Sequence, residues 1–126
     1  MPDTHVTITG NLTDDPELSF TPTGTAVANF RVAVTPRVND GGTWRDGETS
    51  YFRVQAWRDL AEHTAESLAK GNRVLVVGQL KARSWEDKAT GERRSVIEVT
   101  AEEVGPSLRW AIARPERTKR KANSDS

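Results

Sequence analysis

The spacing of apolar residues changes its period once along this chain, and that change limits the possible folds more than any other feature. Alternation of apolar and polar residues predicts β-strands over 6–12, 26–34, 49–57, 73–85 and 93–104. Between the third and fourth of these strands, residues 59–69 follow a helical period with one apolar stripe. The predicted order is therefore three strands, one helix and two strands.

A small antiparallel sheet has to protect its edges, because edge strands expose unpaired N–H and C=O groups. Five strands with one helix between the third and fourth fit the five-stranded OB-fold barrel, an all-β architecture. A two-sheet sandwich is the alternative, but the position of the single helix favours the barrel. An additional sixth, short strand is expected over 105–113, where Leu108, Trp110 and Ile112 alternate.

Turn-forming residues separate the predicted elements. Asp59 is expected as the N-cap or first-turn acid of the helix, and Gly71 as its C′ residue. Gly78 interrupts the fourth strand, as at a bulge or a sharp bend in a barrel. Residues 13–18 are expected to form a turn, and residues 35–48 a polar loop that carries Trp44.

Composition excludes several classes of protein. The 126 residues suit a single domain, which we place at 1–113, followed by a basic disordered tail at 114–126. Cysteine is absent, which excludes disulfides, Cys-ligated zinc and thiol catalysis. No apolar run approaches the ~20 residues that span a bilayer, and no signal peptide is visible, so we expect a cytoplasmic protein without membrane contact.

Catalysis has little support in the sequence. The two histidines, His5 and His63, fall on a predicted strand and the helix without evident partners. No metal-ligand spacing, phosphate-binding glycine loop or nucleophile elbow is present. We therefore expect no enzymatic activity, no cofactor and no metal site.

The charge balance does not by itself favour a nucleic-acid partner. The chain holds 18 basic and 18 acidic residues, for a formal net charge of zero. Residues 111–126 carry five basic and two acidic side chains, a net +3, so the rest of the chain carries −3. Attraction to phosphate must therefore come from the local arrangement of cations.

The third strand carries large side chains on the face that is expected to meet solvent. Its apolar face consists of Phe52, Val54 and Ala56. Its other face carries Tyr51 and Trp57, with Arg53 between them. Since same-face neighbours lie roughly 7 Å apart, at twice the ~3.3 Å rise, the two rings are about 20 Å apart and can serve different nucleotides.

The fourth strand repeats this combination with Lys81, Arg83 and Trp85 on one face. Aromatic rings interleaved with cations suit a single nucleic-acid strand, because unpaired bases stack on rings while phosphates need positive charge. Trp44, on its loop, is placed to fold over such a ligand. The predicted binding residues are Trp44, Tyr51, Arg53, Trp57, Lys81, Arg83 and Trp85.

Structural roles remain open for several of these aromatics. Trp57 closes its strand next to the helix and can simply pack beneath it. Trp110 is interpreted as structural or interfacial. Leu75 and Val77 share a strand face with Trp85, which predicts that this face is half subunit interface and half ligand groove.

Four stretches together resemble the bacterial single-stranded DNA-binding proteins over roughly residues 4–104. They are GNLTDDPELSFTPTGTAVANFRVA, YFRVQAWRDLAE, LAKGNRVLVVGQL and RSWEDKATGERR. The resemblance implies an OB-fold that assembles into a homotetramer and protects single-stranded DNA in replication, recombination or repair, in the cytoplasm with the nucleoid. Tyr51, Trp57 and Trp85 match the family's DNA-binding aromatics motif by motif, whereas Trp44 matches a loop tryptophan only loosely.

The C-terminal region departs from the family's usual pattern. Typical members end in a glycine- and proline-rich tail with an acidic tip that recruits other enzymes, whereas this sequence ends in KRKANSDS. A short paralogue without such recruitment and a truncated chain are both compatible with that ending. GPSLRWAIA at 105–113 is similar to actinobacterial members, in which an extra strand hooks onto a neighbouring subunit; this implies an interface formed by Leu108, Trp110 and Ile112.

Two other functions remain alternatives at this stage. One is an OB module that acts mainly as a protein-interaction or assembly subunit of a replication complex, which zero net charge slightly favours. The other is binding of RNA through the same groove. Binding assays with matched DNA and RNA strands separate all three.

Overall fold

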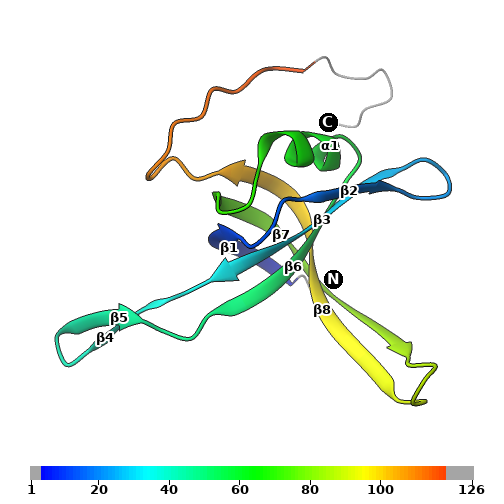
Figure 1. The fold of residues 1–126 in the computed structure, drawn as a ribbon, viewed down its shortest axis with the longest axis horizontal. Coiled ribbons are helices and arrows are strands. Elements are labelled where there is room, and N and C mark those ends of the chain that lie inside the picture. Colours follow the sequence, from blue (N-terminus) through cyan, green and yellow to red (C-terminus); the bar gives the residue numbers. More distant parts are fainter. Residues whose placement is uncertain (1–3, 119–126) are drawn as a thin grey trace.

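The structure is a computed structural model, and it describes residues 4–118. Its elements are β1 (His5–Leu12), β2 (Glu17–Phe20), β3 (Ala26–Val34), β4 (Arg37–Asp40), β5 (Thr43–Asp46), β6 (Ser50–Trp57), α1 (Arg58–Ser67), β7 (Arg73–Glu86) and β8 (Arg93–Pro106). Figure 1 shows a small barrel from which two hairpins project in different directions, β4–β5 and the outer half of β7–β8. Within this part of the chain, no helix is long and apolar enough to cross a membrane.

Five strands close the barrel in the order β1–β7–β8–β6–β3, and β3 returns to β1. All neighbours are antiparallel except β6 and β8, which run parallel. Along the chain, α1 lies between β6 and β7, the third and fourth of the five barrel strands. This topology confirms the predicted OB-fold. β1 closes the barrel because its last residues pair with both β7 and β3, and a Cβ on Gly10 at this point would overlap the Ala33 carbonyl oxygen.

The barrel interior is built mainly from β-branched side chains, as alternating strands require. The largest fully buried side chains are Val32, Val54, Val74, Val76 and Val99. The predicted apolar faces of the second, third and fourth strands thus point inward, which leaves the alternate residues of the same strands on the outside. This alternation is what delivers Tyr51 and Arg53 to the outer surface.

The helix forms where predicted, but its ends differ from the prediction. The N-cap is Trp57, and Asp59 lies in the first turn, the second of the two positions predicted for it. Arg58 adopts a left-handed conformation (φ 60°) that turns the chain sharply from β6 into α1. The helix ends at Ser67, and its C-cap Leu68 is extended. Gly71 (φ 90°) is therefore not the C′ residue but belongs to the following turn, where its N–H donates to the Leu12 carbonyl.

Three short strands are absent from the sequence-based prediction. β2 pairs with β3 across a turn at residues 22–23, and all four of its residues are exposed. The predicted loop at 35–48 is in fact a hairpin, because β4 and β5 pair with each other through all four of their residues. None of the three shows an alternation of buried and exposed residues, which is the signal on which the prediction depended.

The predicted irregularity at Gly78 is confirmed. The pairing of β7 with β8 shifts register between Val77 and Gly78, which leaves Glu102 as the extra residue on β8. A Cβ on Gly78 would overlap the Thr100 carbonyl oxygen, so only glycine permits this close approach of the two strands.

The predicted sixth strand has no partner within the described chain. β8 extends to Pro106, and residues 107–118 contain neither helix nor strand. Leu108, Trp110 and Ile112 are 64%, 74% and 83% exposed, so this chain alone does not bury them. The predicted disordered tail falls mostly on residues 119–126, outside the described residues.

Candidate nucleic-acid interface

Strand register aligns four charged residues in one row across the outside of the barrel. Arg31 of β3 lies opposite Arg53 of β6, Arg53 lies opposite Glu98 of β8, and Glu98 lies opposite Lys81 of β7. Because neighbouring strands are about 4.8 Å apart, the row spans roughly 14 Å. Two arginines directly opposite each other repel, so this position on the sheet favours a bound anion.

Aromatic rings lie along the same outer face. Tyr51 is 61% exposed and lies two residues before Arg53 on β6, while Trp57 at the end of β6 is half-buried beside the helix. Trp85 is 41% exposed on the outer half of β7, four residues beyond Lys81. Tyr51 and Trp85 are therefore open to solvent and Trp57 only partly so, and stacking of bases on these rings remains a prediction.

Two rings of this outer face each have an arginine guanidinium over them. The Arg31 guanidinium carbon lies 5.7 Å from the centroid of the Tyr51 ring, and that of Arg83 lies 4.9 Å from the Trp85 ring. Both distances are within the range of cation–π attraction. The cations and rings of the outer face thus form pairs, which the alternation pattern alone did not predict.

The predicted phosphate ligands fall into two groups. Among the described residues, Arg53 and Lys81 are exposed and take part in no ion pair. Arg83 instead donates through Nε (3.3 Å) and Nη2 (3.4 Å) to the two carboxylate oxygens of Glu98. Arg53 and Lys81 are therefore better placed to meet phosphate than Arg83 is.

Arg94, opposite Trp85 on β8, is also bound to an acid. Its Nε lies 2.9 Å from Asp87 Oδ2, and the Ala89 N–H donates to Asp87 Oδ1 at 2.9 Å. The Ala89 N–H, followed by the Arg94 guanidinium, holds the pKa of Asp87 below its ordinary value. The turn of the β7–β8 hairpin is thus tied to the strand that faces Trp85.

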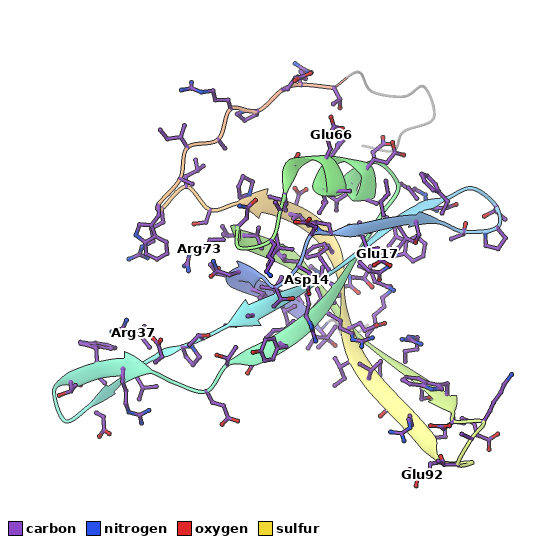
Figure 2. All side chains as sticks on the ribbon, viewed as in Figure 1. Asp14, Glu17, Arg37, Glu66, Arg73 and Glu92 are labelled. Atoms are coloured by element: carbon purple, nitrogen blue, oxygen red, sulfur yellow. The ribbon has the colours of Figure 1, made fainter. Side chains whose placement is uncertain are left out.

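Trp44 lies apart from the barrel on the β4–β5 hairpin and is 59% exposed. Exposed ion pairs Arg37–Asp46 (3.7 Å) and Arg45–Asp40 (3.5 Å) link the two strands. Figure 2 shows Arg37 on this hairpin and Glu92 at the far end of β7–β8, with the barrel between the two hairpins. The candidate interface thus consists of a central barrel face with a tryptophan-bearing hairpin on either side.

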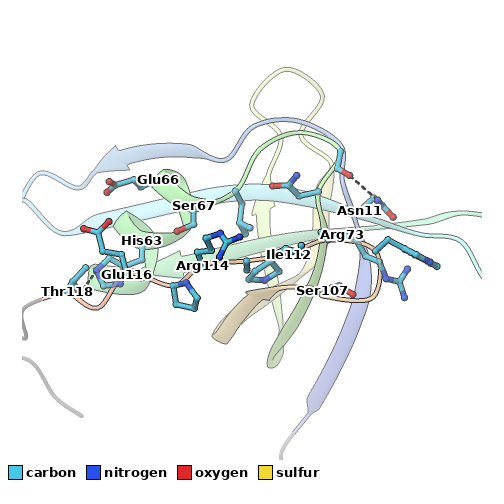
Figure 3. Close-up of a pocket in the computed structure, with 18 residues that line it drawn as sticks. Asn11, His63, Glu66, Ser67, Arg73, Ser107, Ile112, Arg114, Glu116 and Thr118 are labelled. Atoms are coloured by element: carbon cyan, nitrogen blue, oxygen red, sulfur yellow. Dashed lines mark hydrogen bonds between the residues drawn. The ribbon is translucent and has the colours of Figure 1, made fainter.

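A hollow of about 820 Å³ lies between α1 and residues 107–118 (Figure 3). Arg73 and Arg109 approach the Trp110 ring at 4.7 and 5.3 Å, and His63 Nε2 lies 3.3 Å from the Thr118 hydroxyl. Arg73 begins β7, twelve residues before Trp85, so the two sites are up to about 40 Å apart along the strand. This hollow is therefore separate from the aromatic face.

Comparison with known proteins decides the family. The sequence model of the single-strand binding protein family matches residues 3–107. This chain belongs to the single-strand binding protein family. It is 55% identical to a single-stranded DNA-binding protein of Paenarthrobacter aurescens over 96% of this chain and 71% of the relative. It is 56% identical to one of Mycobacterium tuberculosis over 94% of this chain and 73% of that protein.

A solved structure supports the same assignment. The crystal structure of a small single-stranded DNA-binding protein from Streptomyces coelicolor superposes with a TM-score of 0.73 at 34% identity, over 86% of this chain and 97% of that one. The family resemblance and the fold class predicted from the sequence are both confirmed.

The outer face of the barrel contains one cation, Arg31, that was not predicted as a binding residue from the sequence. Arg31 alternates outward on β3, but only the register places it opposite Arg53 and over Tyr51. The predicted Arg53, Lys81 and Trp85 come together with it on one continuous face. Among residues 4–118, no group of three or more potential metal ligands is present.

Proposed function

We propose that this protein binds single-stranded DNA through the outer face of its barrel, without regard to sequence. The observation that carries this proposal is the row of Arg31, Arg53 and Lys81 around Glu98, with exposed Tyr51 and Trp85 beside it. Unpaired bases stack on the rings, and each stacked base contributes about 1–3 kcal/mol. Every base has a π-face, so such binding tolerates any sequence.

Phosphates of the bound strand pair with Arg53 and Lys81, and Arg31 joins them because its contact with Asp14 is long, at 4.0 Å, and exposed. Trp44 closes over the strand from the β4–β5 hairpin, and Trp57 stacks a base where β6 meets α1. These local cations explain how a chain with no net charge attracts a polyanion.

The protein acts by binding and not by catalysis, as its family membership indicates. Coating a single strand shields it from nucleases and from re-pairing, which suits replication, recombination and repair. We place this activity in the cytoplasm, with the nucleoid.

Assembly into a homotetramer is part of the proposal. Its support is the set of exposed apolar side chains away from the predicted DNA-binding rings, namely Leu75 near the start of β7 and Leu108, Trp110 and Ile112 beyond β8. A single chain gains nothing from exposing these side chains to water, whereas a second copy buries them. The mass of the free protein, measured by light scattering, tests this directly.

Titration with an oligo-dT strand, followed by tryptophan fluorescence, tests DNA binding. The unaltered protein is expected to be quenched, and Trp57→Ala with Trp85→Ala is expected to lose most of the quenching and at least tenfold in affinity. Trp57→Phe with Trp85→Phe is the matched control, since it keeps two rings and should keep most of the affinity. Unchanged affinity in the alanine variant contradicts the stacking assignment, and preference for a matched RNA competitor redirects the proposal to RNA.

A further inference from the structure

Glu98 is an acid in an unexpected position, on the face proposed to bind a polyanion. Its side chain is only 11% exposed, whereas that of Arg83 is 54% exposed. By register it lies between Arg53 on β6 and Lys81 on β7. An anion at this point opposes binding of phosphate to the same cations, so a protein that binds DNA here needs a reason to keep it.

The hydrogen bonds of Glu98 indicate why an acid is present on this face. Its two carboxylate oxygens accept from Nε and Nη2 of Arg83, a two-point contact that fixes the plane of the guanidinium. The same guanidinium lies over the Trp85 ring at 4.9 Å. Glu98, Arg83 and Trp85 therefore form a chain of contacts that runs from a buried carboxylate to an exposed ring.

The location of this chain of contacts supports its role. The buried core between β7 and β8 ends where Leu80 lies opposite Val99, which is fully buried. In the next inward-facing pair towards the hairpin tip, Ala82 and Ile97 are both exposed. Glu98 thus anchors Arg83 where the hairpin leaves the barrel. Beyond this point, no buried core holds the strand that carries Trp85.

Asp14, Arg31 and Tyr51 form a similar but looser series on the same face. The Asp14 side chain is 71% exposed and approaches Arg31 Nη2 only at 4.0 Å. Arg31 in turn lies 5.7 Å from the Tyr51 ring, further than Arg83 lies from Trp85. The looser series provides a matched control, because it has the same chemical parts without the buried two-point contact.

We propose that Glu98 is a positioning residue for Trp85, an inference that rests on the proposed binding of single-stranded DNA. Glu98 holds Arg83 flat against one face of the indole, which leaves the opposite face for one base. Arg83 then acts as a support for the ring and not as a phosphate ligand. The alternative is that Glu98 only neutralises the neighbouring cations and so stabilises the free barrel.

The test measures the share of oligo-dT quenching that comes from Trp85. Each variant is titrated with and without an added Trp85→Phe substitution, and the difference gives that share. Glu98→Gln is expected to lower the share of Trp85 at least twofold. Released Arg83 then meets a phosphate, so the slope of log affinity against log salt steepens by about 0.7, the value for one additional contact on a single strand. Asp14→Asn is expected to change neither quantity.

Arg83→Lys separates positioning from charge, because lysine keeps the positive charge but lacks the planar two-point geometry. It is expected to lower the share of Trp85 as Glu98→Gln does, and it decides the question if Glu98→Gln fails to fold by circular dichroism. An unchanged share of Trp85 in Arg83→Lys overturns the inference, whatever the salt slope of Glu98→Gln. If the unaltered protein itself fails to bind oligo-dT, the proposed function fails, which is a distinct result.

Discussion

The β4–β5 and β7–β8 hairpins each carry an exposed tryptophan, but they hold it in different ways. β4–β5 pairs only with itself, none of its residues is buried, and two exposed ion pairs link its strands. β7 and β8 are 14-residue strands whose inner halves form part of the barrel wall and whose outer halves stay paired beyond it. Glu98 also links the base of this second hairpin to Arg83.

Because of this difference, the same small barrel presents two tryptophan rings, Trp44 and Trp85, that are held with unequal rigidity. Isolated two-stranded hairpins are marginally stable, and exposed ion pairs contribute about 0–1 kcal/mol each. Trp44 must therefore be ordered when it meets a strand of DNA, which costs conformational entropy. Trp85 is already held by the barrel and by Arg83, so its ordering costs less conformational entropy than that of Trp44. A larger part of its stacking energy therefore contributes to affinity.

The largest expected effect is on the free energy of unfolding, which should respond differently to glycine substitutions in β7 and in the β4–β5 hairpin. Gly78→Ala places a methyl group against the Thr100 carbonyl and should lower the free energy of unfolding by about 1–3 kcal/mol or more. Gly42→Ala, which meets no atom within 4 Å, strains only the β4–β5 turn (φ 91°) and should leave global unfolding nearly unchanged. Urea unfolding at one fixed protein concentration measures both.

Gly105→Ala is the matched control for Gly78→Ala, since a Cβ there meets no atom within 4 Å and the residue lies on the same strand pair. Its stability should equal or slightly exceed that of the unaltered protein. Equal destabilisation by the changes at 42 and 78 would show that the β4–β5 hairpin is as integral to the barrel as β7–β8.

The next effect concerns affinity for DNA. Trp85→Ala should weaken oligo-dT binding by about 1–3 kcal/mol, the value of one stacked base, whereas Trp44→Ala should cost less than about 1 kcal/mol. The reason is the ordering cost that the β4–β5 hairpin bears. Calorimetric titration of both variants, with the two phenylalanine variants as controls, gives the ranking. A larger loss for Trp44→Ala would reverse the comparison.

A smaller effect is expected in the salt dependence. Lys81→Gln and Arg53→Gln should each reduce the slope of log affinity against log salt by about 0.7, because each removes one phosphate contact. Arg45→Gln, on β5 and paired with Asp40, should change the slope by much less. Titrations between about 50 and 300 mM NaCl measure these slopes. Equal changes in all three variants would mean that phosphate contacts extend over both hairpins.

The smallest effect is a pH dependence of the β7–β8 turn. The Ala89 N–H and the Arg94 guanidinium lower the pKa of Asp87. A carboxyl with a depressed folded-state pKa stabilises the structure above its unfolded pKa, and this contribution is lost as pH falls through the folded value. Carbon NMR of the Asp87 carboxyl should therefore show a midpoint below that of an unstructured aspartate.

Arg94→Gln should raise this midpoint without restoring the unstructured value, because the Ala89 N–H, the larger cause, remains. A midpoint in the unaltered protein at or above that of a free aspartate would show that the turn is not held as described.

Strands with one buried face could be predicted from the sequence, because burial on one side imposes alternation. Ala26–Val34 and Ser50–Trp57 agree with the prediction to within one residue. Strands without a buried face could not: β2 and the β4–β5 hairpin are held by backbone pairing and exposed side chains, which leave no periodic trace.

The site was predictable strand by strand but not across strands. Alternation placed Arg53, Lys81 and Trp85 outward, whereas their alignment with Arg31 and Glu98 depends on register, which the whole barrel determines. The N-cap at Trp57 has a similar cause, because the left-handed Arg58 that follows it belongs to the sharp junction of β6 with α1 and has no signal in local propensity.

Fluorine NMR of the protein labelled with 5-fluorotryptophan most directly tests the claim that one outer face of the barrel binds the strand. The four tryptophans provide four reporters, and Trp110, beside Arg73 at the opposite end of β7, is the internal control. Saturating oligo-dT should shift the resonances of Trp44, Trp57 and Trp85 and leave that of Trp110 in place. A shift confined to Trp110, or none at all with bound DNA, would contradict the account.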